Sequence, residues 1–190
     1  MAILGALAGL LFAAAVLIAL FAVIFYNRMV RMRNMVRASW ADIDVQLKKR
    51  HDLVPNLHET VRGYAAHEKS IFEKVSEARS AAMGASVPAD RAKAENALAG
   101  TLRSLFAVAE AYPELKANAN FMQLQSQLQE LENNIESARR YYNAVVRDLN
   151  TVVESFPSNL VASSFGFAQA EFFELESPDV ERQPVKVSFS

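Results

Sequence analysis

The stretch FMQLQSQLQELENNIESARRYYNAVVRDLNTVVESF, residues 121–156, carries apolar side chains at alternating spacings of three and four residues without a miss. The apolar positions are Phe121, Leu124, Leu128, Leu131, Ile135, Ala138, Tyr142, Val145, Leu149, Val152 and Phe156. This spacing puts them all on one face of an α-helix, so the stretch predicts a long amphipathic helix. Asn120 and Gln123 predict a capping box at its start, and Pro157 predicts its end.

A second run of the same kind lies upstream, between Val36 and Ala82. Charges interrupt its 4,3 register only at Arg50 and Glu68, and the apolar members are Val36, Trp40, Ile43, Leu47, Val54, Leu57, Val61, Tyr64, Ile71, Val75, Ala78 and Ala82. A register kept over this length predicts a coiled-coil-like helix seam. Pro55 lies outside the seam phase, and we expect it to kink or interrupt the helix near Val54.

A third pattern lies between Pro88 and Pro113. Leu98, Leu102, Leu105, Ala109 and Tyr112 again alternate four and three residues apart. A helix with a single apolar stripe cannot leave that stripe exposed to water, so three such helices must pack on one another. The prediction is an all-α fold, an antiparallel bundle of long helices with coiled-coil-like seams.

The amino-terminal stretch Ile3 to Phe25 contains no charged side chain. As a helix it reaches about 34 Å, enough to cross a bilayer. No Lys or Arg precedes it, which favours an uncleaved anchor over a signal peptide. The predicted organisation is a transmembrane anchor at 1–26 that continues into a helical bundle at 27–157. Residues 158–190 are expected to hold a segment whose phenylalanines dock on the bundle, then a weakly ordered acidic tail.

A cluster of arginines follows the apolar stretch, namely Arg28, Arg31, Arg33 and Arg37. Basic residues flank the cytoplasmic side of membrane spans, so the bulk of the chain is expected in the cytoplasm, with the exterior as the alternative. Gly5 and Gly9 form a GxxxG step inside the span. Such a step lets two helices approach closely and favours self-association, although small residues are also common near membrane edges.

Composition and motifs argue against several function classes. The 190 residues include no cysteine, which excludes thiol chemistry, and 20 basic against 21 acidic residues argue against a nucleic-acid binder. His51 and His58 lie about 10 Å apart along a helix and cannot share a metal unaided, and neither HExxH nor a phosphate-binding glycine loop occurs. We therefore predict no enzyme, cofactor or metal site, while a site assembled from several helices stays open.

Two charges occupy seam positions, Arg50 and Glu68. A charge in a seam is costly unless it is paired, so each is expected to find a partner on another helix, where it sets register or marks a binding surface. The alternative is that each reaches solvent from the edge of the bundle. His51 and His58 flank the seam, where they border a neighbouring helix.

The segments YNRMVRMRNMVRASWADIDVQLKKRHDLVPNLHETVRGYAAHE, VSEARSAA and LQSQLQELENNIESARRYYNAVVRDLNTVVESFPSNLVASSFGF together resemble the LemA family of bacterial membrane-anchored proteins. The match covers nearly the whole chain. It departs at LENNI, residues 131–135, where the family more usually has a sequence close to TENRI. The resemblance implies a helical bundle on one transmembrane helix, with no established activity, cofactor or catalytic residue. Some relatives are associated with magnetosome membranes, and others resemble companions of membrane proteases or surface proteins.

These observations lead to a functional hypothesis and two alternatives. We expect a scaffold or adaptor in the bacterial inner membrane that contacts lipid, assembles with itself and organises membrane proteins or membrane shape. A regulatory binding module for a membrane protease or another membrane-protein partner is the first alternative, with Arg50 and Glu68 as recognition residues. A hydrolase or metalloenzyme with a site built across helices is the second.

Overall fold

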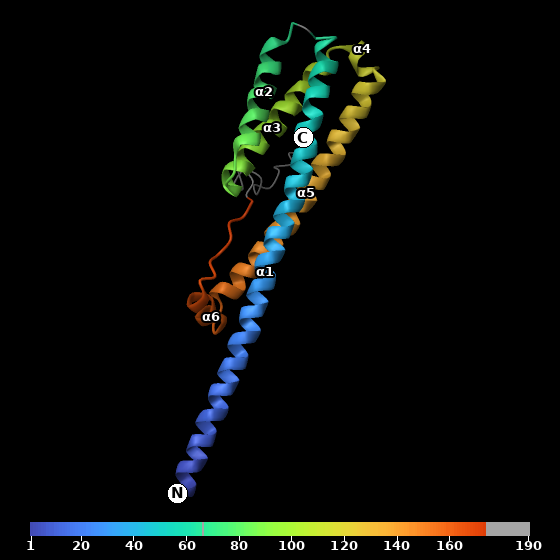
Figure 1. Ribbon diagram of the computed structural model, residues 1–190. Coiled ribbons are helices and arrows are strands. Elements are labelled where there is room, and N and C mark those ends of the chain that lie inside the picture. Colours follow the sequence, from blue (N-terminus) through green and yellow to red (C-terminus); the bar gives the residue numbers. More distant parts are fainter. Residues whose placement is uncertain (66, 174–190) are drawn as a thin grey trace, which may run out of the picture. The chain divides into compact units, whose positions relative to one another are not determined.

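The computed structural model describes residues 1–65 and 67–173, and every regular element in these ranges is an α-helix (Figure 1). The helices are α1 (Ala2–Arg62), α2 (Lys69–Gly84), α3 (Pro88–Ala109), α4 (Pro113–Lys116), α5 (Ala119–Glu154) and α6 (Ser158–Phe165). The chain divides into two compact units, both of which include parts of α1 and α5. The prediction of an all-α fold, with an apolar N-terminal helix that continues into long packed helices, is confirmed.

The first unit, here the bundle unit, comprises Ala41–Arg140 and residues 171–173. The second part of α1, the helices α2 and α3, and the first part of α5 lie side by side in it (Figure 1). Its apolar core contains Val54, Leu57, Val61, Ala65, Phe72, Val75, Ala82, Leu98, Leu102, Leu105, Ala109, Leu115, Phe121 and Leu128. The predicted stripes supply most of this core, because each helix turns its apolar face toward the others.

The predicted continuous seam from Val36 to Ala82 is wrong at its middle. α1 ends at Arg62, and the backbone N–H groups of Tyr64 and Ala65 both turn back to the carbonyl of Val61. Gly63 opens this turn, and glycine has a high helix cost. The break lets α2 fold back along α1, which buries both stripes within one chain. An interruption at Pro55 is wrong as well, because α1 continues through that residue.

Two other boundaries differ from the sequence prediction. Asn118, and not Asn120, caps α5, because its Oδ1 accepts hydrogen bonds from the N–H groups of Asn120 at 2.9 Å and Phe121 at 3.1 Å. α3 ends at Ala109, and Pro113 begins the short helix α4. The helix α4 carries Leu115, whose side chain is fully buried in the core of the bundle unit.

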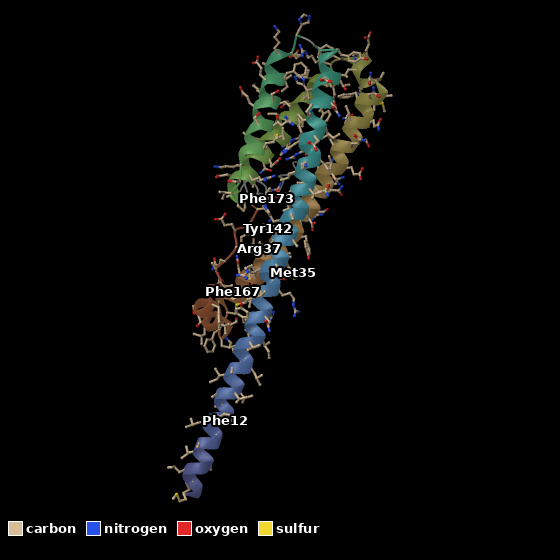
Figure 2. The ribbon with its side chains drawn as sticks, viewed as in Figure 1. Phe12, Met35, Arg37, Tyr142, Phe167 and Phe173 are labelled. Atoms are coloured by element: carbon tan, nitrogen blue, oxygen red, sulfur yellow. The ribbon has the colours of Figure 1, made fainter. Side chains whose placement is uncertain are left out.

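The second unit, here the N-terminal unit, comprises Met1–Trp40 and Tyr141–Ala170. Its first residues form a bare helix, in which an 18-residue window has a mean hydropathy of 2.9 and no buried residue. Phe12 lies in this part of α1 and points away from it without a neighbouring element (Figure 2). By length and composition, this apolar helix fits a single-pass membrane anchor.

Further along α1, the N-terminal unit has a small apolar core. It contains Met29, Val152, Val161, Ala162 and Phe167, and Phe21, Ala22 and Phe25 of α1 pack against it. α6 ends at Phe165, and the capping residue Gly166 has a φ of 69°, in the left-handed region that favours glycine. The Asn150 side chain then holds Ala170 by two hydrogen bonds, of 2.8 and 3.0 Å, to its N–H and carbonyl.

Two of the described phenylalanines after Pro157 are buried, and two are exposed. Phe167 is buried in the N-terminal unit, and Phe173 is buried in the bundle unit, where the Arg139 guanidinium lies 4.7 Å from its ring centre. Phe165 and Phe172 are exposed. The predicted weakly ordered tail, with Phe189, lies outside the described residues apart from its first few positions.

Candidate functional site: a buried charge network

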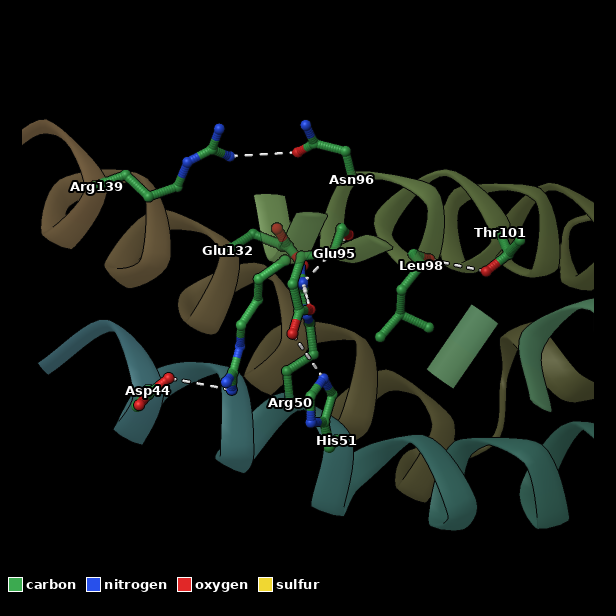
Figure 3. A network of polar contacts seen from close by, with 10 residues as sticks. Asp44, Arg50, His51, Glu95, Asn96, Leu98, Thr101, Glu132 and Arg139 are labelled. Carbon is green, nitrogen blue, oxygen red and sulfur yellow. Dashed lines mark hydrogen bonds and ion pairs between the residues drawn. The ribbon is translucent and has the colours of Figure 1, made fainter. Parts of the chain in front are cut away.

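Arg50 is the centre of a polar network inside the bundle unit (Figure 3). It lies in α1 between the core residues Leu47 and Val54, and only 2% of it is exposed. Its Nη1 donates to Glu132 Oε1 of α5 at 2.6 Å, and its Nη2 donates to both the carboxylate and the backbone carbonyl of Glu95 in α3. One side chain therefore joins three helices.

Glu95 is the buried partner, with 3% of its surface exposed. Its second carboxylate oxygen lies 2.9 Å from Nε2 of His51, which is also buried. Burial alone raises the pKa of the Glu95 carboxyl, but the hydrogen bond from His51 and the positive charge of Arg50 together lower the pKa below its ordinary value of 4.5. Glu95 is therefore an ionised carboxylate at neutral pH, held by two cationic or hydrogen-bonding neighbours.

Arg79 of α2 is tied to the same place through the backbone of α1. A proline has no N–H, so Pro55 cannot donate to the carbonyl four residues earlier, which is that of His51. Arg79 Nε donates to this carbonyl at 2.9 Å. The side chain from α2 thus supplies the hydrogen bond that Pro55 removes, which explains how α1 passes through Pro55 without a break.

Two further contacts border the network. Arg91 of α3 lies 3.1 Å from Asp44 of α1, and Arg139 Nη1 donates to Asn96 Oδ1 at 3.4 Å (Figure 3). Each of these pairs joins two different helices of the bundle unit. That the network sets the register of these helices stays a prediction, since the contacts show only which helices are joined.

The central members of the network are buried, whereas one member reaches solvent. Glu95, Arg50 and His51 are all buried, and the Glu132 side chain is 38% exposed. In residues 1–65 and 67–173 no three His, Asp or Glu side chains are grouped to hold a metal ion. A small groove nearby is lined by Val54, Pro55, His58, Val75, Ser76, Arg79 and Ser80, which include no pair of acidic groups.

The other residues singled out from the sequence lie apart from this network. His58 is half-buried, with its ring 4.7 Å from that of Phe72 in α2. Glu68 precedes α2 in the turn after α1, where its N–H donates to the carbonyl of Ala65. A Cβ atom added to Gly5 or Gly9 meets nothing within 4 Å.

The membrane-junction arginines belong to the N-terminal unit. Arg28, Arg31, Arg33 and Arg37 are all exposed, and the guanidinium of Arg33 lies 5.1 Å from the ring centre of Phe167.

Sequence reasoning found Arg50 and His51 but missed Glu95, Glu132 and Arg79. A signal for Glu95 was present, because the spacing of Leu98, Leu102 and Leu105 continued backward by three residues reaches position 95. Glu132 sits beside the seam position Leu131, within the LENNI segment. No periodic signal marks Arg79, because its role follows from Pro55 on a different helix.

The fold and these contacts define a class, a helical-bundle protein with an apolar N-terminal helix fit to anchor it in a membrane. The chain belongs to the LemA family, whose model matches residues 39–189.

Named relatives extend the comparison. The chain is 26% identical to magnetosome protein MamQ 2 of Paramagnetospirillum magneticum over 175 residues, which cover 78% of this chain and 64% of the relative. It is 25% identical to magnetosome protein MamQ of Magnetospirillum gryphiswaldense over 78% of this chain and 64% of the relative. Protein LemA of Metamycoplasma hominis is 24% identical over 85% of this chain and 74% of the relative. The chain thus spans somewhat less than two thirds of the length of the MamQ relatives, and none of these names denotes an enzymatic activity.

Proposed function

We propose that this protein is a non-enzymatic, membrane-anchored scaffold or adaptor that associates with copies of itself and organises membrane proteins or membrane shape. The observation that carries the proposal is the unpartnered apolar part of α1, in which Gly5 and Gly9 meet no neighbour within the chain. In a bilayer, a face of small residues lets two helices approach closely, and the van der Waals packing between them stabilises their association.

The path of α1 supports a mechanical role. The helix runs from Ala2 to Arg62 without a linker, so the segment proposed to lie in the bilayer and the first helix of the bundle unit are one element. Weak contacts between such anchored copies add up through avidity, since each contact raises the effective concentration for the next. Two relatives are magnetosome proteins by name, which fits a role in organising a cell structure.

Location follows from the charges beside the span. We place the anchor in the inner membrane of a bacterium, with the bulk of the chain on the cytoplasmic side, because Arg28, Arg31, Arg33 and Arg37 follow the apolar stretch. These residues also hold the junction against anionic lipid, at about 1 kcal/mol for each basic residue near the surface.

Cross-linking in lipid tests the self-association. The full chain is reconstituted in vesicles at low and high protein-to-lipid ratios, then cross-linked and sized. We expect oligomers that the double variant Gly5→Leu/Gly9→Leu loses, while Leu7→Phe, which adds bulk on the opposite face of the helix, keeps them. A wild-type chain that stays monomeric at the high ratio contradicts the proposal. Electron microscopy of the same vesicles then distinguishes a ring, cage or lattice from small oligomers.

The regulatory binding module is better tested at Glu68 than at Arg50. Reversing the charge of Arg50 would unfold the bundle unit, because the guanidinium is buried against two carboxylates. Glu68 lies in a turn and is partly exposed. If Glu68→Lys abolishes capture of a membrane protein and leaves helicity intact, the binding module is favoured over the scaffold.

A further inference from the structure

Residues 155–170 form an uncharged segment that no function proposed so far uses. Between Glu154 and Glu171 the chain has no Asp, Glu, Lys or Arg, and it includes α6. Three of its large apolar side chains are exposed, at 80% for Phe156 and 58% each for Leu160 and Phe165. Exposed apolar groups of this size in an uncharged surface mark an interaction site.

The contacts between this segment and α1 indicate what covers its exposed side chains. All contacts described here lie within the N-terminal unit. Phe165 and Phe167 have ring centres 5.0 and 5.7 Å from that of Tyr26, the first residue after the apolar stretch, and Phe21 and Phe25 pack on the same small core. α6 is therefore beside the end of the predicted span, in contact with residues on both sides of the membrane boundary.

The three serine hydroxyls of α6 are already bonded within the chain, whereas Oδ1 of Asn159 is buried without a hydrogen-bond partner. The hydroxyls of Ser163 and Ser164 both donate to the carbonyl of Leu160, and the hydroxyl of Ser158 donates to the carbonyls of Val152 and Ser155. Moving such groups out of water costs less than moving groups that depend on water for their hydrogen bonds. The guanidinium of Arg33, 5.1 Å from the ring centre of Phe167, adds a positive charge of the kind that anionic lipid attracts.

We infer that residues 155–170 are a second membrane contact, an interfacial element that inserts Phe156, Leu160 and Phe165 into the lipid beside the anchor. Interfacial helices bury their apolar face about 5–10 Å into the boundary between headgroups and acyl chains. The contact would fix the rotation of α1 about its own axis, because only one side of the helix carries α6. This inference rests on the membrane anchor of the proposed function, and it does not depend on self-association.

Fluorescent labelling in vesicles tests the inference on the full chain. The chain contains no cysteine, so an environment-sensitive fluorophore can be attached at one introduced cysteine without background. We choose Leu160→Cys and Phe156→Cys as test sites and Leu11→Cys as a marker of the anchor. Tyr141→Cys is the matched control, because Tyr141 is 54% exposed in the same unit. Its neighbour Tyr142 packs on Trp40, about 22 Å beyond Phe25 along α1.

The lipid is phosphatidylcholine with phosphatidylglycerol, with and without a nitroxide on the acyl chain near the headgroup. We expect blue-shifted emission at Leu160 and Phe156 and several-fold stronger quenching by the nitroxide lipid than at Tyr141. Water-like emission at Leu160 with a quenched Leu11 overturns the interfacial contact and leaves the anchor standing. Emission that is blue-shifted but not quenched means that protein covers the segment, which also overturns it. A Leu11 probe in water overturns the anchor and this inference together.

Discussion

Arg50 is the residue whose removal should cost the bundle unit most. Its loss removes the guanidinium from the buried Glu95 carboxylate, and removing one partner of a buried ion pair costs about 3–5 kcal/mol. We therefore expect Arg50→Met to lower the free energy of unfolding by that amount, measured by denaturant titration of helical circular dichroism in detergent.

Two further variants distinguish the contribution of the Arg50–Glu95 ion pair from the effect of replacing an arginine. Arg50→Met combined with Glu95→Leu should recover most of the loss, because no buried charge is then left unpaired. Arg103→Met, an exposed arginine on the same helix as Glu95, should change stability little. If Arg50→Met is as mild as Arg103→Met, the network does not hold the helices together.

The lowered pKa of Glu95 makes stability depend on acid pH. Because the pKa is lower in the folded chain than in the unfolded chain, the stabilisation is complete above the ordinary value of 4.5 and is lost as pH falls through the lowered folded value. We expect the denaturant midpoint of the wild type to drop below pH 4.5 more steeply than that of Glu95→Gln. Parallel pH profiles for the two proteins would contradict this assignment.

The helix α1 keeps its continuity at Pro55 through a side chain from α2. If Arg79 replaces the hydrogen bond that proline lacks, then Arg79→Met should cost about 1–3 kcal/mol, the penalty of an unsatisfied buried carbonyl. In a Pro55→Ala background the cost should fall, because the N–H of residue 55 can then donate to the His51 carbonyl.

A double-mutant cycle measures this coupling from four denaturant curves. The coupling energy should be positive and near 1 kcal/mol if the two residues serve the same carbonyl. Arg62→Met is the control. Arg62 is exposed at the end of the same helix, so we expect no coupling energy between it and Pro55. Additive costs for Pro55 and Arg79 would show that the arginine contributes through its own packing.

For the complete molecule, orientation and lipid preference follow from the exposed arginines. Replacing Arg28, Arg31 and Arg37 by Gln should weaken the preference for anionic vesicles by about 1 kcal/mol per residue, measured by partitioning against salt. Arg33 is left in place, because it also contacts Phe167. A preference that is unchanged would mean that the arginines do not face lipid headgroups.

The same arginines predict topology. A carboxy-terminal tag on the wild type should be protected from protease in intact bacterial cells and cleaved after lysis. Cleavage of the tag in intact cells would place the bulk of the chain outside the cytoplasm, in line with the alternative orientation.

Periodicity was enough to predict the amphipathic helices, and the uncharged run Ile3 to Phe25 was enough to predict the apolar N-terminal helix. Burial of Ile43, Leu47, Leu57, Leu98, Leu105, Leu128 and Ile135 follows from the 4,3 spacing, because an amphipathic helix has only one side to bury. The spacing could not predict the turn at Gly63, since the 4,3 register continues from Val61 to Ile71 in the same phase, with only the charge of Glu68 in it. Whether such a run stays one helix or folds back depends on the packing energy of the two stripes.

Arg50 and His51 could be singled out from the sequence, because they are polar residues at or beside a seam. Their partners could not be identified in this way. Glu95, Glu132 and Arg79 come from three other helices, at separations of 45, 82 and 28 residues along the chain from their α1 partners. The position of α6 beside Tyr26 is of the same kind, because residues 26 and 165 meet only after the chain has folded. Local spacing determines which side of each helix is apolar, but the pairing between distant helices is decided by the tertiary packing, because residues far apart along the chain can meet only after it has folded.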